Sequence, residues 1–178
     1  TTAGETVIVG ITQETSTAIT VTSITLVGPT DSASFTSTGE RSVDTGCNNV
    51  AELWFVPAFE GGASITVKLS AAADTELWIL RVTGLSSNPI GAGSVANDQP
   101  STTTIDVPPI AAPGGRLVVT TAASCAAIQQ LAASSPFTDV GEEDGEDTAY
   151  LITSTPGSFA VSWKSTAGEW NASTVVFQ

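Results

Sequence analysis

The sequence predicts an all-β protein, an antiparallel β-sandwich of two sheets with at most one short helix, formed by residues 1–178 as a single domain. Three observations predict this fold. Short runs rich in Val, Ile, Thr and aromatic residues recur along the chain, turn residues separate them, and only one run has a helical composition. A length of 178 residues fits one domain, because two domains would each bury little core.

The predicted strands are short and separated by Gly, Pro, Asn and Asp. In Ser64–Leu69 and in Phe159–Lys164 every second residue is apolar, which is typical of a strand in an antiparallel sheet with one buried face. The candidate strands are Val7–Ile11, Ala18–Val27, Val50–Val56, Ser64–Leu69, Leu77–Val82, Thr102–Val107, Arg116–Thr121, Ala149–Thr153, Phe159–Lys164 and Ser173–Phe177.

Two segments interrupt this pattern. Ala122–Ala133 is rich in Ala and poor in β-branched residues, so it is either a short helix or a crossover. The segment from Ser86 to Pro100 contains Asn88-Pro89 and Gly93, and we expect it to be a crossover loop rather than a linker between domains.

Composition excludes several functions. A formal net charge of −13, with only five basic residues scattered singly, argues against nucleic acid and anionic lipid as partners. No apolar run reaches the roughly 18 residues of a membrane span, so no membrane insertion is expected. The chain has no His, which excludes Ser–His–Asp and Cys–His catalysis and His-based zinc sites within it.

The two cysteines, Cys47 and Cys125, are either a redox or metal pair or one disulfide that closes a long loop. We expect the disulfide, because two cysteines in a chain without His suit an oxidising compartment. This expectation favours a secreted, extracellular or cell-surface protein, or a virion component.

The densest cluster of carboxylates lies between residues 139 and 147, where six of nine residues are acidic. Carboxylate oxygens next to glycines suit Ca²⁺, although the spacing does not fit an EF-hand loop. The segment is therefore either a solvated acidic loop or a Ca²⁺ site. The ligands expected for Ca²⁺ are Asp139, Glu142, Asp144 and Asp147.

Four tryptophans offer candidates for carbohydrate binding, since exposed aromatic faces stack on sugar rings. Trp163 and Trp78 align with apolar neighbours and are expected in the core. Trp54 and Trp170 are the candidates for the surface, each with an acidic neighbour, Glu52 and Glu169.

The same acidic neighbours leave a hydrolase open, because glycosidases place two carboxylates on either side of a sugar bond. Glu52, Glu76 and Glu169 all lie close to a tryptophan in the sequence. The alternative is that these are acids at strand ends or sheet edges, beside core aromatics.

A resemblance covers almost the whole chain. It is carried by the order of strand residues, namely Glu52-Leu53-Trp54-Phe55, Gly61-Gly62, Ile65-Thr66-Val67, the run from Leu77 to Leu85, the run from Gly157 to Trp163, and the closing Val175-Val176-Phe177. This order resembles a β-sandwich module of bacterial secreted and cell-surface proteins and of phage structural proteins. The resemblance implies a jelly-roll-like fold and an appended, non-catalytic role, and it carries over no catalytic residue.

We therefore expect a non-catalytic extracellular binding module that recognises a glycan or a surface polymer, assisted by Ca²⁺ if the acidic segment binds it. The alternative is a structural subunit of an extracellular filament, a surface layer or a phage virion, whose partners are identical subunits. A hydrolase with a carboxylate pair is the second alternative.

Overall fold

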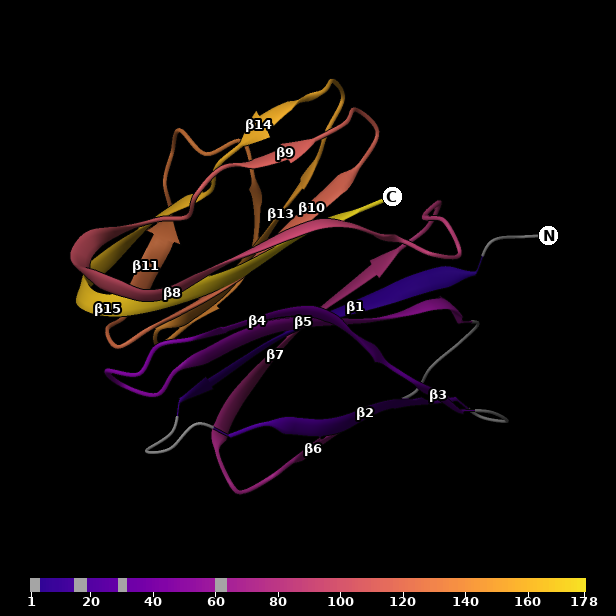
Figure 1. Cartoon of the computed structure of the whole chain (residues 1–178), viewed down its shortest axis with the longest axis horizontal. Helices are drawn as coiled ribbons and strands as arrows, with labels where there is room; N and C mark the ends of the chain where they lie inside the picture. Colours follow the sequence, from indigo (N-terminus) through magenta and orange to yellow (C-terminus); the bar gives the residue numbers. More distant parts are fainter. Residues whose placement is uncertain (1–3, 15–18, 29–31, 60–63) are drawn as a thin grey trace.

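The computed structural model describes residues 4–14, 19–28, 32–59 and 64–178, and all regular secondary structure in these residues is β-strand (Figure 1). The predicted all-β, antiparallel β-sandwich is confirmed. No helix in this part of the chain has the length and apolar character needed to cross a membrane. The Gly61-Gly62 turn of the resemblance lies outside the described residues.

Two antiparallel sheets form the sandwich. Sheet A has the order β4-β5-β1-β7, and sheet C the order β11-β15-β10-β13-β12 with β8 paired to β15. Sheet A consists of β1 (Glu5–Glu14), β4 (Thr36–Val43), β5 (Val50–Phe59) and β7 (Asp74–Val82). Sheet C consists of β8 (Ile90–Asp106), β10 (Leu117–Ser124), β11 (Ile128–Leu131), β12 (Thr138–Glu143), β13 (Glu146–Ile152) and β15 (Ser162–Phe177).

Two smaller sheets add to these layers, so the structure extends the predicted pair of sheets. Sheet B contains β2 (Val21–Val27), β3 (Ser32–Ser34) and β6 (Ser64–Leu69), and it lies against the outer face of sheet A. Sheet D pairs β9 (Ile110–Ala112) with β14 (Gly157–Phe159) on the outer side of sheet C. Figure 1 shows the stacking order B, A, C, D.

Three apolar clusters fill the spaces between the layers. One between sheets A and B contains Val9 and Ile11, and one between sheets A and C contains Ile8 and Val119. The third, on the outer side of sheet C, contains Trp163. Because alternate residues of a strand point to opposite faces, β1 supplies one set of side chains to each neighbouring layer.

The sequence and the structure differ at the segment Ala122–Ala133, which is not a helix. Its first residues continue β10, and Ile128–Leu131 form β11. Strand β10 pairs with β13 on one side and β15 on the other, and all eight of its residues are buried. Small side chains such as Ala122 and Ala123 fit there because both faces of the strand are covered by other layers.

The expected crossover loop at 86–100 is also partly strand, because β8 begins at Ile90 and pairs with β15 along most of its length. Four register shifts interrupt this pairing. The irregular ladder explains why the alternation of side chains is too weak to recognise in the sequence.

Candidate functional site

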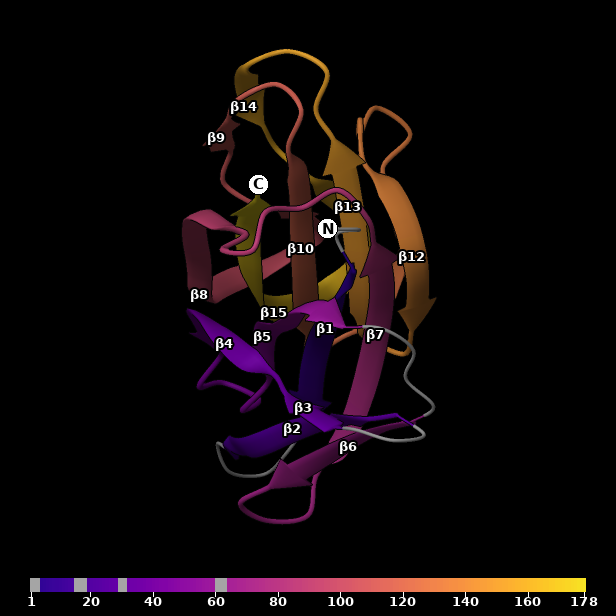
Figure 2. The ribbon, with the colours of Figure 1, turned by 90° about the vertical axis from the view of Figure 1, so that its right-hand side faces the viewer.

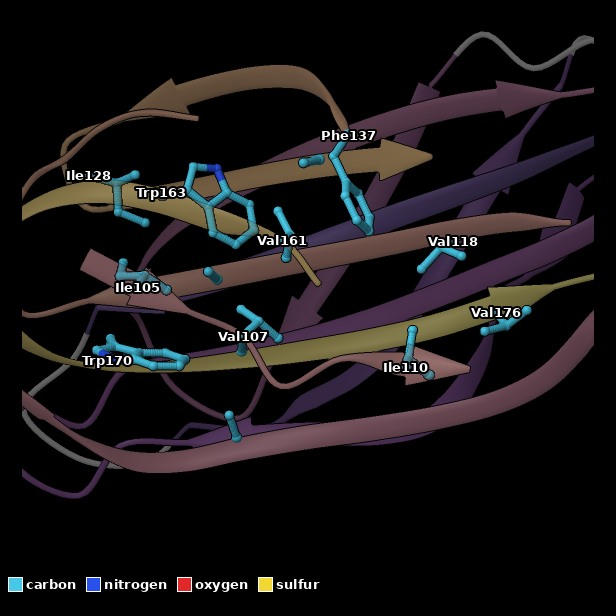
Figure 3. Close-up of a cluster of buried hydrophobic side chains, with 14 of the residues drawn as sticks. Ile105, Val107, Ile110, Val118, Ile128, Phe137, Val161, Trp163, Trp170 and Val176 are labelled. Carbon is cyan, nitrogen blue, oxygen red and sulfur yellow. The ribbon is translucent and has the colours of Figure 1, made fainter. Parts of the chain in front are cut away.

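The aromatic residues expected at the surface do not form an exposed platform. Trp170 is 4% exposed and packs in the apolar cluster on the outer side of sheet C, where Figure 3 shows it among Ile105, Val107 and other core side chains. Trp54 is half-buried against the cluster between sheets A and B. The expected exposure of Trp170 is therefore wrong, because β15 continues through this residue instead of turning at Gly168.

The acidic neighbours of these tryptophans lie apart. Glu52 is buried on β5, where the register places it opposite Arg41 on β4. Burial raises the pKa of Glu52, while the Trp54 side chain and the charge of Arg41 lower it. Glu169 is exposed on β15 of sheet C, against Gly46 in the turn that follows β4. The structure does not bring Glu52 and Glu169 together as a carboxylate pair.

The acidic segment 139–147 forms the β12–β13 hairpin, and its turn residues Asp144 and Gly145 both have positive φ (40° and 158°). The hairpin places the predicted Ca²⁺ ligands at different positions instead of bringing them together. Asp139 and Asp147 lie close to each other, whereas Asp144 is at the turn beside Glu14. The side chain of Glu142 is not among those that the structure describes.

Asp147 is completely buried beneath the outer core of sheet C. Burial raises its pKa to about 9, and the negative charge of the neighbouring Asp139 adds to this shift. The backbone of Thr148 and the side chain of Trp163 act in the opposite direction. Because removal from water dominates, Asp147 keeps its proton at neutral pH.

The neighbouring Glu146 points to the other face of its sheet, toward sheet A. It is 2% exposed, and burial together with the negative charges of Glu76, Glu14 and Asp74 raises its pKa to about 9. Among these charges the Glu76 carboxyl has the largest effect on the pKa of Glu146. We call this group of carboxylates between the two sheets the acidic end: Glu14, Asp74, Glu76, Asp144 and Glu146.

The space between sheets A and C changes from apolar to acidic along the strands. In its middle, the Thr148 hydroxyl donates to the Thr121 hydroxyl at 2.9 Å, and a Cβ on Gly10 would lie 2.9 Å from the Thr148 oxygen. The sheets thus approach closely at Gly10, with the acidic end on one side of this contact and the apolar cluster containing Ile8 on the other.

A groove of about 450 Å³ opens where the edges of the two sheets meet on one side of the sandwich. It is lined by residues 79–83 of β7 and its continuation, together with Leu117, Val140, Tyr150 and Ile152 of sheet C and its flanks. Trp78 separates the groove from the acidic end, since it follows Glu76 on the same face of β7 and packs over Gly141. The groove is mainly apolar, and its exposed rim includes Ile79 (49% exposed) and Ile152 (71% exposed).

The opposite side of the sandwich is closed. There the Ser42 hydroxyl of β4 donates to the carbonyl of Ala96 and to the side chain of Asn97 on β8, and the Ser173 hydroxyl donates to the Glu40 carbonyl. Figure 2 shows β4 and β8 along this side and β7 and β12 along the other. In the part of the chain that the structure describes, β7 and β12 each pair with one strand only, so each has a free hydrogen-bonding edge.

The predicted disulfide is confirmed: Cys47 and Cys125 are bonded, with their Cα atoms 5.8 Å apart. It joins the β4–β5 turn of sheet A to the end of β10 in sheet C. The buried carboxylate of Asp44 lies 3.1 Å from both sulfurs and accepts the Gly46 N–H at 2.8 Å. Because disulfides persist in oxidising surroundings, this bond indicates a location outside the reducing cytosol.

The sequence predicts a role for only two members of the acidic end, Glu76 and Asp144, and misses the other three. One available signal is Asp144-Gly145, a dipeptide typical of a tight hairpin turn. With that turn in place, alternation along the following strand puts Glu146 and Thr148 on one face and Asp147 on the other.

Comparison with protein-family models, curated proteins and solved structures found no match to this chain. The fold and the site define the protein as an antiparallel β-sandwich with one closed and one open side. The resemblance to modules of secreted and virion proteins stays a prediction.

Proposed function

We propose that this protein is a non-catalytic extracellular binding module that takes up an extended polypeptide segment along the open side of its sandwich. The observation that carries the proposal is the groove beside β7, where a free strand edge adjoins an apolar floor. An extended segment that pairs with such an edge gains main-chain hydrogen bonds, and its alternate side chains enter the groove. Its volume of about 450 Å³ lies in the usual range of ligand sites.

Binding without chemistry is supported by what lines the groove. Among the described residues of its lining, Arg81 is the one charged side chain, and it forms an ion pair with Glu5. The coupled carboxylates Glu76 and Glu146 lie beyond Trp78, toward the other end of β7. A polypeptide with apolar side chains fits this lining better than a glycan, because most of the lining is aliphatic and Tyr150 is its one aromatic residue.

The test is a selection of random linear peptides displayed on phage against the folded, oxidised protein. We expect enriched peptides with alternating apolar residues, whose binding falls at least tenfold in Ile79→Glu and in Ile152→Glu. The matched control is Val95→Glu, since Val95 is 39% exposed on β8 at the closed side and should leave binding unchanged. Failure to enrich any peptide, or equal loss of binding in the control, would refute the proposal.

A structural subunit is the second candidate, and the exposed apolar residues at the free edge favour it. An unprotected strand edge with apolar neighbours is prone to pair with another copy. Sedimentation over a wide range of protein concentration separates the two candidates. Assembly that rises with concentration and is abolished by Ile152→Glu supports a subunit, whereas a monomer at all concentrations supports a module for other partners.

A further inference from the structure

At the acidic end, two buried polar side chains from different sheets each have one oxygen atom without a hydrogen-bond partner among the described residues. Glu146 on β13 is 2% exposed, and its Oε1 atom has no hydrogen-bond partner among the described residues. Thr12 on β1 is completely buried, and its Oγ1 atom likewise lacks one. Thr12 is the register partner of Glu76 on β7, so both lie on the face of sheet A that looks toward Glu146.

Three further carboxylates surround this buried pair at the solvent side. Glu14 and Asp74 are register partners at the ends of β1 and β7. The Glu14 side chain reaches the opposite sheet, because its Oε1 atom lies 3.4 Å from where a Cβ on Gly145 would be. Asp144 adds its charge next to Glu14. All three side chains are exposed, so dissolved ions reach these three carboxylates directly.

Negative charges surround Glu14 and Glu146. The groups that act on Glu14 and Glu146 are all acidic, and the ion pair that the described residues form is that of Arg81 with Glu5, near the other end of β7. A buried carboxylate with an unpartnered oxygen costs free energy unless a proton or a cation compensates it. Oxygen ligands from carboxylates and a hydroxyl, with room for water, are those preferred by hard divalent cations.

We propose that the acidic end binds one divalent cation of the Ca²⁺ class, held from the interior by Glu146, Glu76 and Thr12 and from solvent by the exposed carboxylates. Outside the bonded cysteines and Asp44, no three described acidic residues bring their oxygens within 4.8 Å of one another. Binding therefore draws the exposed side chains of Glu14, Asp74 and Asp144 inward. The cation also bridges sheet A and the β12–β13 hairpin, which flank the groove, but the site does not depend on the proposed function of that groove.

The first experiment titrates CaCl₂ into the full chain at neutral pH and follows heat and thermal unfolding. We expect one ion per chain and a rise in Tm that NaCl of equal ionic strength does not reproduce. Glu146→Gln and Asp74→Asn should each weaken the affinity at least tenfold. Asp74 is exposed at the end of its strand, so that variant tests the site even if a change at buried Glu146 disturbs folding.

The control variant is Asp147→Asn, because Asp147 belongs to the same hairpin but faces the outer core. It should leave Ca²⁺ binding unchanged. The proposal is overturned if about 10 mM CaCl₂, above the range for extracellular modules, produces neither heat nor a shift in Tm. It is equally overturned if Asp147→Asn abolishes binding while Asp74→Asn and Glu146→Gln do not, since the ion would then lie at the other carboxylate pair.

Discussion

Replacing Asp147 with asparagine should stabilise the protein at neutral and alkaline pH. The Asp147 carboxyl has an ordinary pKa of 3.8 and a pKa of about 9 in the fold, where burial is the main cause of the increase. Above pH 4 the unfolded chain has lost this proton, while the folded protein still holds it. Folding then takes up a proton, so the contribution of Asp147 to stability is complete below pH 3.8 and is lost as pH rises toward 9.

The expected magnitude follows from these two values. Each pH unit between them costs about 1.4 kcal/mol of unfolding free energy, which gives an upper limit of about 4 kcal/mol at pH 7. Local relaxation and entry of water reduce the cost of a buried ionisable group. We therefore expect Asp147→Asn to gain roughly 1–3 kcal/mol at pH 7, because the amide has the same shape and no proton to lose.

Urea unfolding at several pH values between 5 and 9, without divalent cations, measures this effect. The unfolding free energy of the wild-type protein should fall as pH rises. The slope of this free energy against pH gives the number of protons taken up on folding, and this number should be smaller in Asp147→Asn by up to one. Asp139→Asn should reduce the slope less, because the charge of Asp139 is the smaller cause of the shift. An unchanged slope in Asp147→Asn, or a loss of stability at pH 8, would contradict the reasoning.

Three further predictions concern stability and are measured by urea unfolding. Replacing Cys47 and Cys125 with serine should cost about 4 kcal/mol, because the bond spans 78 positions and restricts the unfolded chain; no loss would mean that the bond does not form. Trp170→Ala should cost about 3–5 kcal/mol, as expected for a large core side chain, and a cost below about 1 kcal/mol would place Trp170 at the surface. Arg81→Ala should cost less than about 1 kcal/mol, since its ion pair with Glu5 is exposed; a larger loss would show that Arg81 also supports the groove.

The sequence predicts well those strands that have one buried face. Ser64–Leu69 is a strand with the bounds predicted for it, and its residues alternate between exposed and half-buried side chains. Trp163 is completely buried, as its register with Val161 predicts. In such strands apolar and polar residues alternate, because successive side chains point to the buried face and to the exposed face in turn.

Strands whose two faces are equally buried, or whose pairing is irregular, are not predicted from the sequence. β10 is buried on both faces, so it shows no alternation, and its small residues at 122–124 resemble a helix in composition. β15 passes through Gly168 with register shifts on both sides, and this places Trp170 in the core instead of at a turn. In both cases the partner strands, which are distant in sequence, determine the structure.

The site is harder to predict than the fold because its members come from separate segments. Glu14, Asp74 and Glu146 lie far apart in the chain and meet only because β1 pairs with β7 and sheet A packs against β13. The sequence shows the density of acidic residues at 139–147 but not that the hairpin sends Glu146 and Asp147 to opposite faces. The groove likewise forms where the edges of two sheets meet. The residues of a strand do not show by themselves that the strand lies at an edge.

Amide hydrogen exchange of β7, measured with and without a peptide selected on the folded protein, tests most directly whether the open edge binds a polypeptide. We predict that every second amide of β7 exchanges more slowly once the peptide is bound, because only alternate N–H groups of an edge strand face outward. The amides of β4 and β8 at the closed side should not change. Unaltered exchange in β7, together with new protection at the closed side or in sheet B, would contradict the claim that the open edge is the binding surface.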